Sequence, residues 1–254
     1  MYPILFEPFG FQVSSFGILV ALGALLGGRL FAKAMEERGF DRERAWSIMF
    51  WTLLSGILGA KLWYVAEMIA RTSSDLFWEL LTSRGGLTWY GGLVGGAIAV
   101  LVVARLYGIP LRIATHCAAP GVAAGQCLGR IGCFLVGDDY GRPTDLPWGV
   151  AFPQGLPPTT VPVHPTMLYE AAWLALVAWI LWRRRFTASY LLAEYLILAG
   201  IGRFLDEFLR ENPIVVVGMT NAQLTALACI LCGIGLTLYF RSAPHSQEAV
   251  AERP

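Results

Sequence analysis

The chain has 254 residues, of which 56% are hydrophobic and only 15% are charged. Soluble domains carry about 25% charged residues, so the composition excludes an ordinary soluble protein and indicates a membrane protein. The formal net charge is +1 at pH 7, which indicates no polyanionic partner, and we expect no binding to nucleic acid.

In chain order, seven segments come close to the roughly 20 mostly apolar residues that a membrane-spanning helix needs. They are residues 13–33, 45–70, 87–106, 112–134, 165–182, 188–209 and 219–240. The first segment is too long for the core of a signal peptide and lacks a convincing cleavage site, so we expect it to be retained. The sequence therefore predicts an all-α polytopic membrane protein with about seven transmembrane helices.

We predict a single transmembrane domain over residues 1–240, followed by a disordered cytoplasmic tail at 241–254. Between the fourth and fifth segments lies one long loop, at about 135–164, which is rich in proline and apolar residues. Because it has few charges, we expect it to lie in the headgroup region on the periplasmic side. Trp148 and Phe152 are its predicted interfacial anchors.

The distribution of Lys and Arg predicts the orientation, because cytoplasmic loops carry an excess of positive charge. One side of the predicted membrane domain carries Lys33, Arg38, Arg42, Arg44, Arg105, Arg112, Arg183, Arg184, Arg185, Arg241 and Arg253. The other side carries at most Arg71, Arg84, Arg130, Arg142, Arg203 and Arg210. We therefore expect the N-terminus outside and the C-terminus in the cytoplasm.

The sixth segment contains GRFLDEFLRE, residues 202–211, although a charge inside a membrane costs at least about 2.5–3.5 kcal/mol. In a helix, Arg203, Asp206, Glu207 and Arg210 would share one face. One interpretation is an intrahelical salt-bridge ladder at the outer membrane edge, in which Arg203 pairs with Glu207. The other is a functional site that faces a polar cavity.

The stretch GRIGCFLVGDDYGRPT, residues 129–144, begins near the outer end of the fourth segment and contains several glycines that permit turns and close approach. Arg130 and Arg203, at the same membrane depth, would form a phosphate site, because the planar guanidinium binds phosphate oxygens with two hydrogen bonds. The alternative for Arg130 and Arg142 is that their side chains reach out to lipid headgroups.

The third segment opens with GGLTWYGGLVGG, whose glycines at four-residue spacing predict close helix packing and would place the phenol of Tyr90 beside the site. His164 precedes the predicted start of the fifth segment at Pro165, where it is either a structural cap or a proton acceptor. The five cysteines lie in or beside apolar segments, and we interpret them as packing residues, Cys133 included. We expect neither a metal nor a cofactor.

Five blocks, GGLTWYGGLVGG, GRIGCFLVGDDYGRPTDLPWGVAFP, HPTMLYE, GRFLDEFLRE and MTNAQL, resemble the prolipoprotein diacylglyceryl transferases of bacteria in order and spacing. The resemblance covers nearly the whole chain. It implies transfer of the diacylglyceryl group of phosphatidylglycerol to the lipobox cysteine of a prolipoprotein signal peptide, with release of glycerol phosphate. It also implies a location in the bacterial inner membrane, with bilayer lipid as a partner.

By this resemblance, Arg130 matches the arginine of the G-R-x-G signature and Arg203 the essential arginine of the late helix. The predicted catalytic residues are Arg130, Arg203, Glu207 and Tyr90. The predicted substrate-binding residues are Arg130, Arg142, Arg210, Asp138, Gly141, His164, Tyr169 and Glu170.

The chain also departs from the family pattern. Many members have His where Tyr90 stands, and the signature often reads G-N-F-x-N-G-E where this chain has residues 132–138, GCFLVGD. Phe16-Gly17 replaces an early Tyr-Gly pair. These changes leave the arginines in place and affect the proton acceptor and the choice of acceptor substrate.

The expected mechanism is a direct displacement, in which the acceptor thiolate attacks the glycerol carbon that bears the phosphate. Arg130 and Arg203 would stabilise the departing phosphate, with Tyr90, Glu207 or His164 as the base. One alternative is an anionic-lipid or anion transporter, which would show internal repeats and a site at the membrane midplane. Another is a paralogous lipid transferase with a different acceptor. An intramembrane hydrolase is disfavoured, because neither G-x-S-x-G nor H-E-x-x-H occurs.

Overall fold

The structure, a computed structural model, describes residues 4–7, 13–71, 76–83 and 86–242. Arg84, Arg253 and the predicted tail from residue 243 onward lie outside the described residues. The helices are α1 (Ser15–Glu36), α2 (Arg42–Arg71), α3 (Phe77–Thr82), α4 (Trp89–Leu106), α5 (Leu111–Val136), α6 (Thr166–Arg184), α7 (Leu191–Asp206), the 3₁₀ helix η3 (Glu207–Leu209) and α8 (Asn221–Ser242). The strands are β1 (Ile4–Phe6), β2 (Val13–Ser14), β3 (Val150–Phe152), β4 (Thr159–Val163), β5 (Ile214–Val216) and β6 (Met219–Thr220).

Each of the seven predicted segments coincides with a long helix to within a few residues, the sixth being α7 continued by η3. Among the described helices, α1, α2, α4, α5 and α8 are long and apolar enough to cross a membrane. The protein is therefore a mainly helical membrane protein. The short helix α3 and the three two-stranded antiparallel sheets were not predicted.

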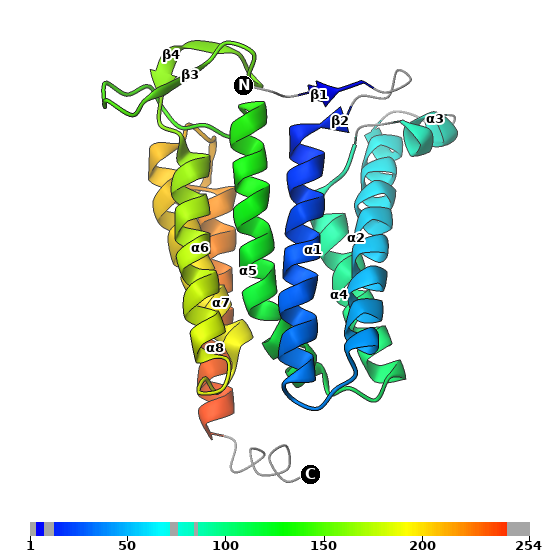
Figure 1. Ribbon diagram of the computed structural model, residues 1–254. Coiled ribbons are helices and arrows are strands. Elements are labelled where there is room, and N and C mark those ends of the chain that lie inside the picture. The colour runs from blue at the N-terminus through cyan, green and yellow to red at the C-terminus, as the bar shows by residue number, and fades with distance from the viewer. Residues whose placement is uncertain (1–3, 8–12, 72–75, 84–85, 243–254) are drawn as a thin grey trace. The chain divides into compact units, whose positions relative to one another are not determined.

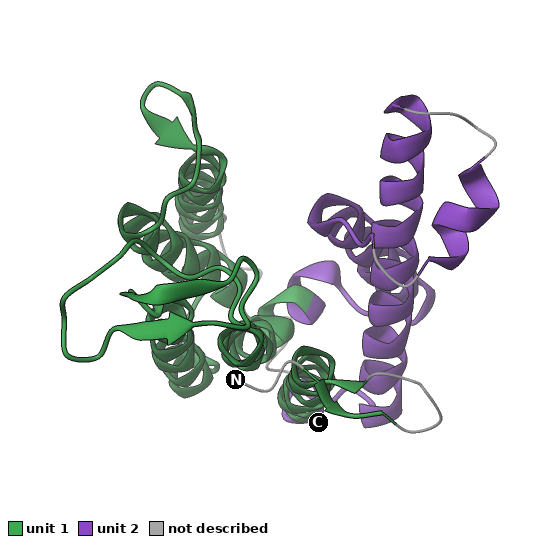
Figure 2. Ribbon diagram, turned by 90° about the horizontal axis from the view of Figure 1, so that it is seen from above, with its two compact units in different colours: residues 1–34, 115–254 green, residues 35–114 purple. Residues whose placement is uncertain are grey.

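The chain divides into two compact units, residues 1–34 with 115–254, and residues 35–114 (Figure 2). In the second unit α2 packs against α4 through glycines. A Cβ atom at Gly91 would collide with the carbonyl oxygen of Gly59, and one at Gly95 with that of Ser55. This close contact confirms the predicted packing role of the glycines in the third segment.

In the first unit, glycines also bring α1 against α5, a contact that was not predicted. A Cβ atom at Gly27 would lie 2.7 Å from the carbonyl oxygen of Gly121, and one at Gly23 would lie 2.8 Å from that of Gly125. The core of this unit joins α5, α6 and α7 through small and branched side chains. They are Ala119, Ala123, Val177, Leu181 and Leu191.

The long loop is folded against the end of the helices, with β3 paired to β4 above the ends of α5 and α6 (Figure 1), and its predicted place in the headgroup region stays a prediction. Phe152 is fully buried, and its ring stacks on Tyr140 with 5.4 Å between the centroids. The prediction of Phe152 as an interfacial anchor is therefore wrong, because the residue packs into a core with Cys133, Val163 and Met167. Trp148 is exposed, and its anchoring role stays a prediction.

Candidate functional site

Seven charged side chains of the first unit form a continuous series in which acidic and basic groups alternate. We call this series the charge chain. Its members in order are Glu170, Arg130, Asp139, Arg210, Glu207, Arg203 and Asp206. They come from α5, α6, α7, η3 and the segments that follow α5 and η3, so segments far apart in the sequence converge here.

Arg130, near the outer end of α5, joins α6 to the loop that follows its own helix. Its Nε atom lies 3.0 Å from Oε2 of Glu170, and its Nη1 atom donates to Oδ2 of Asp139 at 2.8 Å. The side chain is 23% exposed. Among the described residues, no hydrogen bond to its Nη2 atom is present, so this nitrogen still has a hydrogen to donate to an anion.

Arg210 binds Asp139 through both the carboxylate and the backbone. Nη2 donates to Oδ1 at 2.5 Å, and Nη1 donates to the carbonyl oxygen at 2.6 Å. Thr166, at the start of α6, donates to the same carbonyl at 2.9 Å. Asp139 thereby holds two arginines from different elements, one on each carboxylate oxygen.

Arg203 and its neighbours form the other end of the charge chain. Its guanidinium lies 2.8 Å from Oε2 of Glu207 and 3.4 Å from Oδ2 of Asp206. Glu207 is buried, and its other oxygen accepts hydrogen bonds of 2.7 Å from both Asn212 and Thr220. The predicted Arg203–Glu207 pair is present, but the network reaches α5, α6 and β6, so an intrahelical ladder does not account for it.

The two adjacent aspartates after α5 differ in environment. Burial raises the pKa of Asp138 above its ordinary value of 3.8, although a hydrogen bond from the Cys133 thiol acts against this rise. Burial alone would also raise the pKa of Asp139, but the guanidiniums of Arg210 and Arg130 outweigh it and hold the pKa below that value. Of the two aspartates, Asp139 is therefore the one that is ionised and paired with the arginines.

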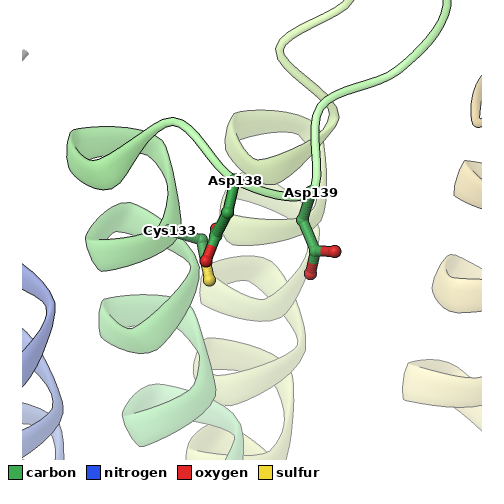
Figure 3. A group of neighbouring side chains, drawn as sticks. All are labelled: Cys133, Asp138 and Asp139. Atoms are coloured by element: carbon green, nitrogen blue, oxygen red, sulfur yellow. The ribbon is translucent and has the colours of Figure 1, made fainter. Parts of the chain in front are cut away.

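Figure 3 shows the Cys133 sulfur beside the Asp138 carboxylate, with the Asp139 carboxylate next to them. The ligand atoms of the three residues lie within 4.8 Å of one another. This spacing alone would suit a metal ion. Arg130 and Arg210, however, both pair with Asp139, and their positive charges would oppose a cation. The group fits a cation poorly, and the expectation of no metal stays a prediction.

The backbone of the segment after Asp139 forms hydrogen bonds with the residues just before α6 and with η3. Gly141 donates to the carbonyl of His164 at 2.9 Å, and the amide of Arg142 donates to the carbonyl of Leu209 at 2.8 Å. A Cβ atom at Gly141 would collide with Leu209 and crowd His164, so the close approach requires glycine here. Gly141 therefore has a structural role, and the side chain of Arg142 is exposed.

His164 and Tyr169, both predicted to bind substrate, lie together beside the charge chain. The ring nitrogen Nδ1 of His164 is 3.4 Å from the hydroxyl of Tyr169, which accepts a 2.8 Å hydrogen bond from the indole of Trp148. Tyr169 directly precedes Glu170 on α6. This aromatic group therefore neighbours the Glu170 end of the charge chain.

A cavity of about 230 Å³ opens between α6 and α7 in the same unit. It is lined by Tyr169, Glu170, Trp173, Gly202, Leu205, Asp206 and Leu209. Two of these, Glu170 and Asp206, are the carboxylate partners of Arg130 and Arg203. The cavity is otherwise apolar, so it offers space for hydrocarbon next to the charged groups.

Tyr90 belongs to the second compact unit and is 55% exposed at the start of α4. Its predicted place beside the arginines therefore stays a prediction. Among the predicted site residues, Arg130, Arg203, Arg210, Glu207 and Glu170 do meet in the charge chain.

Sequence reasoning did not assign Asp139 to the site. It placed Asp206 only on a common helix face with Arg203, without a role of its own. The family signature places its acidic residue at Asp138, and no pattern in the sequence assigns the adjacent Asp139 to the arginines. Only its position between two arginines in the folded chain does so.

The family model of the prolipoprotein diacylglyceryl transferases matches residues 3–239. The chain belongs to this family. A phosphatidylglycerol–prolipoprotein diacylglyceryl transferase of Clostridium tetani is 35% identical over 240 residues, which cover 92% of this chain and 96% of the relative. Relatives with the same designation from Clostridium perfringens and Gloeobacter violaceus are each 31% identical, over 93% and 92% of this chain and 93% and 91% of their own lengths.

Proposed function

We propose that this family member transfers the diacylglyceryl group of phosphatidylglycerol to the lipobox cysteine of prolipoproteins, as the names of its relatives indicate. The observation that carries the proposal within the structure is the convergence of Arg130, Arg203 and Arg210 in one partly buried network. Guanidiniums suit a phosphate group, because their planar fork binds its oxygens with two hydrogen bonds. The names do not favour a transporter.

In the proposed reaction, the acceptor thiolate attacks the glycerol carbon that carries the phosphate ester. A carbon–sulfur bond forms while the carbon–oxygen bond breaks, and the electron pair leaves with glycerol phosphate. Arg130, through its open Nη2 atom, and Arg203 stabilise the charge that gathers on the leaving oxygen. Such preorganised stabilisation is usually the largest catalytic contribution.

The carboxylates of the charge chain hold the arginines in place. Glu207 is buried and already engaged by Arg203, Thr220 and Asn212, which supports an orienting role rather than that of a base. Tyr90 and His164 remain the candidates to accept the thiol proton. The cavity beside Glu170 and Asp206 would accommodate part of an acyl chain.

The protein would act in the bacterial inner membrane as a single domain of seven helices, with its N-terminus and the charge chain on the periplasmic side. The members of the charge chain lie at or beyond the end of α5, at the start of α6 and at or beyond the end of α7. With the N-terminus outside, these ends of the helices would all face the periplasm, which supports the proposed side. Both substrates, the lipid and the signal peptide of the prolipoprotein, would reach such a site from the outer leaflet.

The test is to incubate the purified protein in detergent with phosphatidylglycerol and a lipobox peptide, and to measure the peptide by mass spectrometry. Wild type should add one diacylglyceryl group. Arg130→Ala and Arg203→Ala should each lower the rate about 10²–10³-fold, because each removes a donor to the leaving group.

Arg184→Ala is the matched control, since Arg184 forms a comparable ion pair with Glu194 at the other end of α6. It should retain the wild-type rate. A folded wild-type protein that binds phosphatidylglycerol but adds no mass to the peptide would contradict the proposed activity.

A further inference from the structure

We infer that Asp139 is a positioning residue of the phosphate site, which fixes Arg130 and Arg210 relative to each other. The inference rests on the proposed transferase function, and it assigns a role to a residue outside the predicted site. Its basis is the geometry around a single carboxylate.

The first observation is that the two oxygens of this carboxylate serve different arginines. Oδ2 accepts from Arg130 on α5, and Oδ1 accepts from Arg210 after η3. Without the negative charge between them, these two guanidiniums would repel each other. The carboxylate therefore lies between two cations that come from different elements, and it can set their separation.

The second observation is that the backbone of Asp139 takes part. Its φ angle is 63°, in the left-handed region, where Asp and Asn are several-fold enriched among residues other than glycine. In this conformation its carbonyl oxygen accepts from both Arg210 and Thr166. One residue thus binds both terminal nitrogens of Arg210 and connects them to the start of α6.

The third observation indicates that Asp139 positions Arg130 and does not compete with the phosphate for it. Arg130 donates to Asp139 through Nη1, no hydrogen bond to its Nη2 atom is present among the described residues, and the Asp139 side chain is 44% exposed. A phosphate group can therefore approach Arg130 while Asp139 stays bound. If Asp139 instead occupied the position of the phosphate, its removal would strengthen lipid binding.

Three substitutions separate the contributions. Asp139→Asn keeps a side chain that tolerates a positive φ and removes the charge, whereas Asp139→Gly keeps the backbone conformation and removes the side chain. Asp139→Glu keeps a carboxylate at a different distance from the backbone, so it should retain more activity than the Asn and Gly variants. Asp145→Asn is the control, because Asp145 is an exposed aspartate of the same loop.

We expect Asp139→Asn and Asp139→Gly to lower kcat/KM for phosphatidylglycerol about 10- to 100-fold, since a shift of about 1 Å in a positioned group can cost that much. Asp145→Asn should stay at the wild-type value. Thermal unfolding in detergent shows whether each variant is folded. The kcat/KM of a folded Asn or Gly variant then tests the positioning role of Asp139.

A double-mutant cycle with Arg210→Lys compares the effect of Asp139→Asn on kcat/KM in two backgrounds. A merely structural role of Asp139 would give the same effect in both. If Asp139 acts through Arg210, adding Asp139→Asn to Arg210→Lys should lower kcat/KM much less than it does in wild type. The effect of Asp145→Asn should be the same in both backgrounds.

Independent, multiplicative effects in this cycle would overturn the inference, as would wild-type kcat/KM or a lowered KM in Asp139→Asn. Each of these results leaves the proposed function intact, provided that wild type transfers the lipid. A wild-type protein without transfer would overturn the proposed function and this inference with it.

Discussion

Asp138 and Asp139 are chemically identical neighbours, yet the fold gives their carboxyl groups opposite properties. Asp138 faces the Cys133 thiol in a partly buried place that raises its pKa, whereas Asp139 lies between two arginines that lower its pKa. An ionised Asp139 therefore stabilises the folded state, because its charge has partners there that the unfolded chain lacks.

This difference predicts a pH dependence of stability. The stabilisation by Asp139 should be complete above its ordinary pKa of 3.8 and should be lost as the pH falls through the lowered pKa of the folded state. Measured by thermal unfolding in detergent, Asp139→Asn should be less stable than wild type at pH 6, and the gap should close at lower pH. A gap that stays constant to the lowest accessible pH would contradict this, since the other carboxyl groups are common to both proteins.

At the scale of elements, glycine backbones set how closely the helices pack. The α2–α4 contact of one unit and the α1–α5 contact of the other place glycine carbonyls where any side chain would collide. Between helices in lipid there is little hydrophobic driving force, so such close packing is a main source of attraction.

The neighbouring pair Gly91 and Gly92 tests this packing with a matched control. A methyl group at Gly91 would collide with the carbonyl of Gly59, whereas one at Gly92 would make only ordinary contacts, the nearest at 3.5 Å. We expect Gly91→Ala to lower the free energy of unfolding by about 1–3 kcal/mol, because the helices must move apart. Gly92→Ala should be nearly neutral. Equal stability of the two variants in detergent would show that the contact does not determine the helix separation.

At the scale of the whole molecule, α6 and α7 were predicted as spans but are not among the five helices that qualify by length and apolarity. Both contribute to the charge chain, α6 through Glu170 and α7 through Arg203 and Asp206. Charges in a membrane helix are tolerated when they pair with one another inside the protein. Their pairing therefore supports the proposal that both helices also cross the membrane.

The proposed topology can be tested with fusions. Green fluorescent protein joined after residue 254 should fluoresce and alkaline phosphatase at the same place should be inactive, because the positive charges predict a cytoplasmic C-terminus. Alkaline phosphatase inserted at the exposed Asp145 should be active on the periplasmic side. The reverse pattern at either position would contradict seven spans with the N-terminus outside.

The number and approximate ends of the long helices, the glycine contact of α4 and five members of the charge chain were predicted from the sequence. The helices, the glycine contact and the Arg203–Glu207 pair follow from local patterns, since apolar length, glycine spacing and the i, i+4 relation depend on residues close in the chain. Glu170 was predicted only through the family resemblance.

Two features are visible only in the folded chain: Asp139 pairs with the arginines, and Phe152 is buried in the core instead of lying at the membrane interface. Asp139 is defined by Arg210, 71 residues away, and Phe152 by the hairpin that folds it onto Met167. Such contacts depend on how distant segments meet, which no local pattern records. α7 ends at Asp206 and is followed by the 3₁₀ turn η3, and Arg210, beyond that turn, pairs with Asp139.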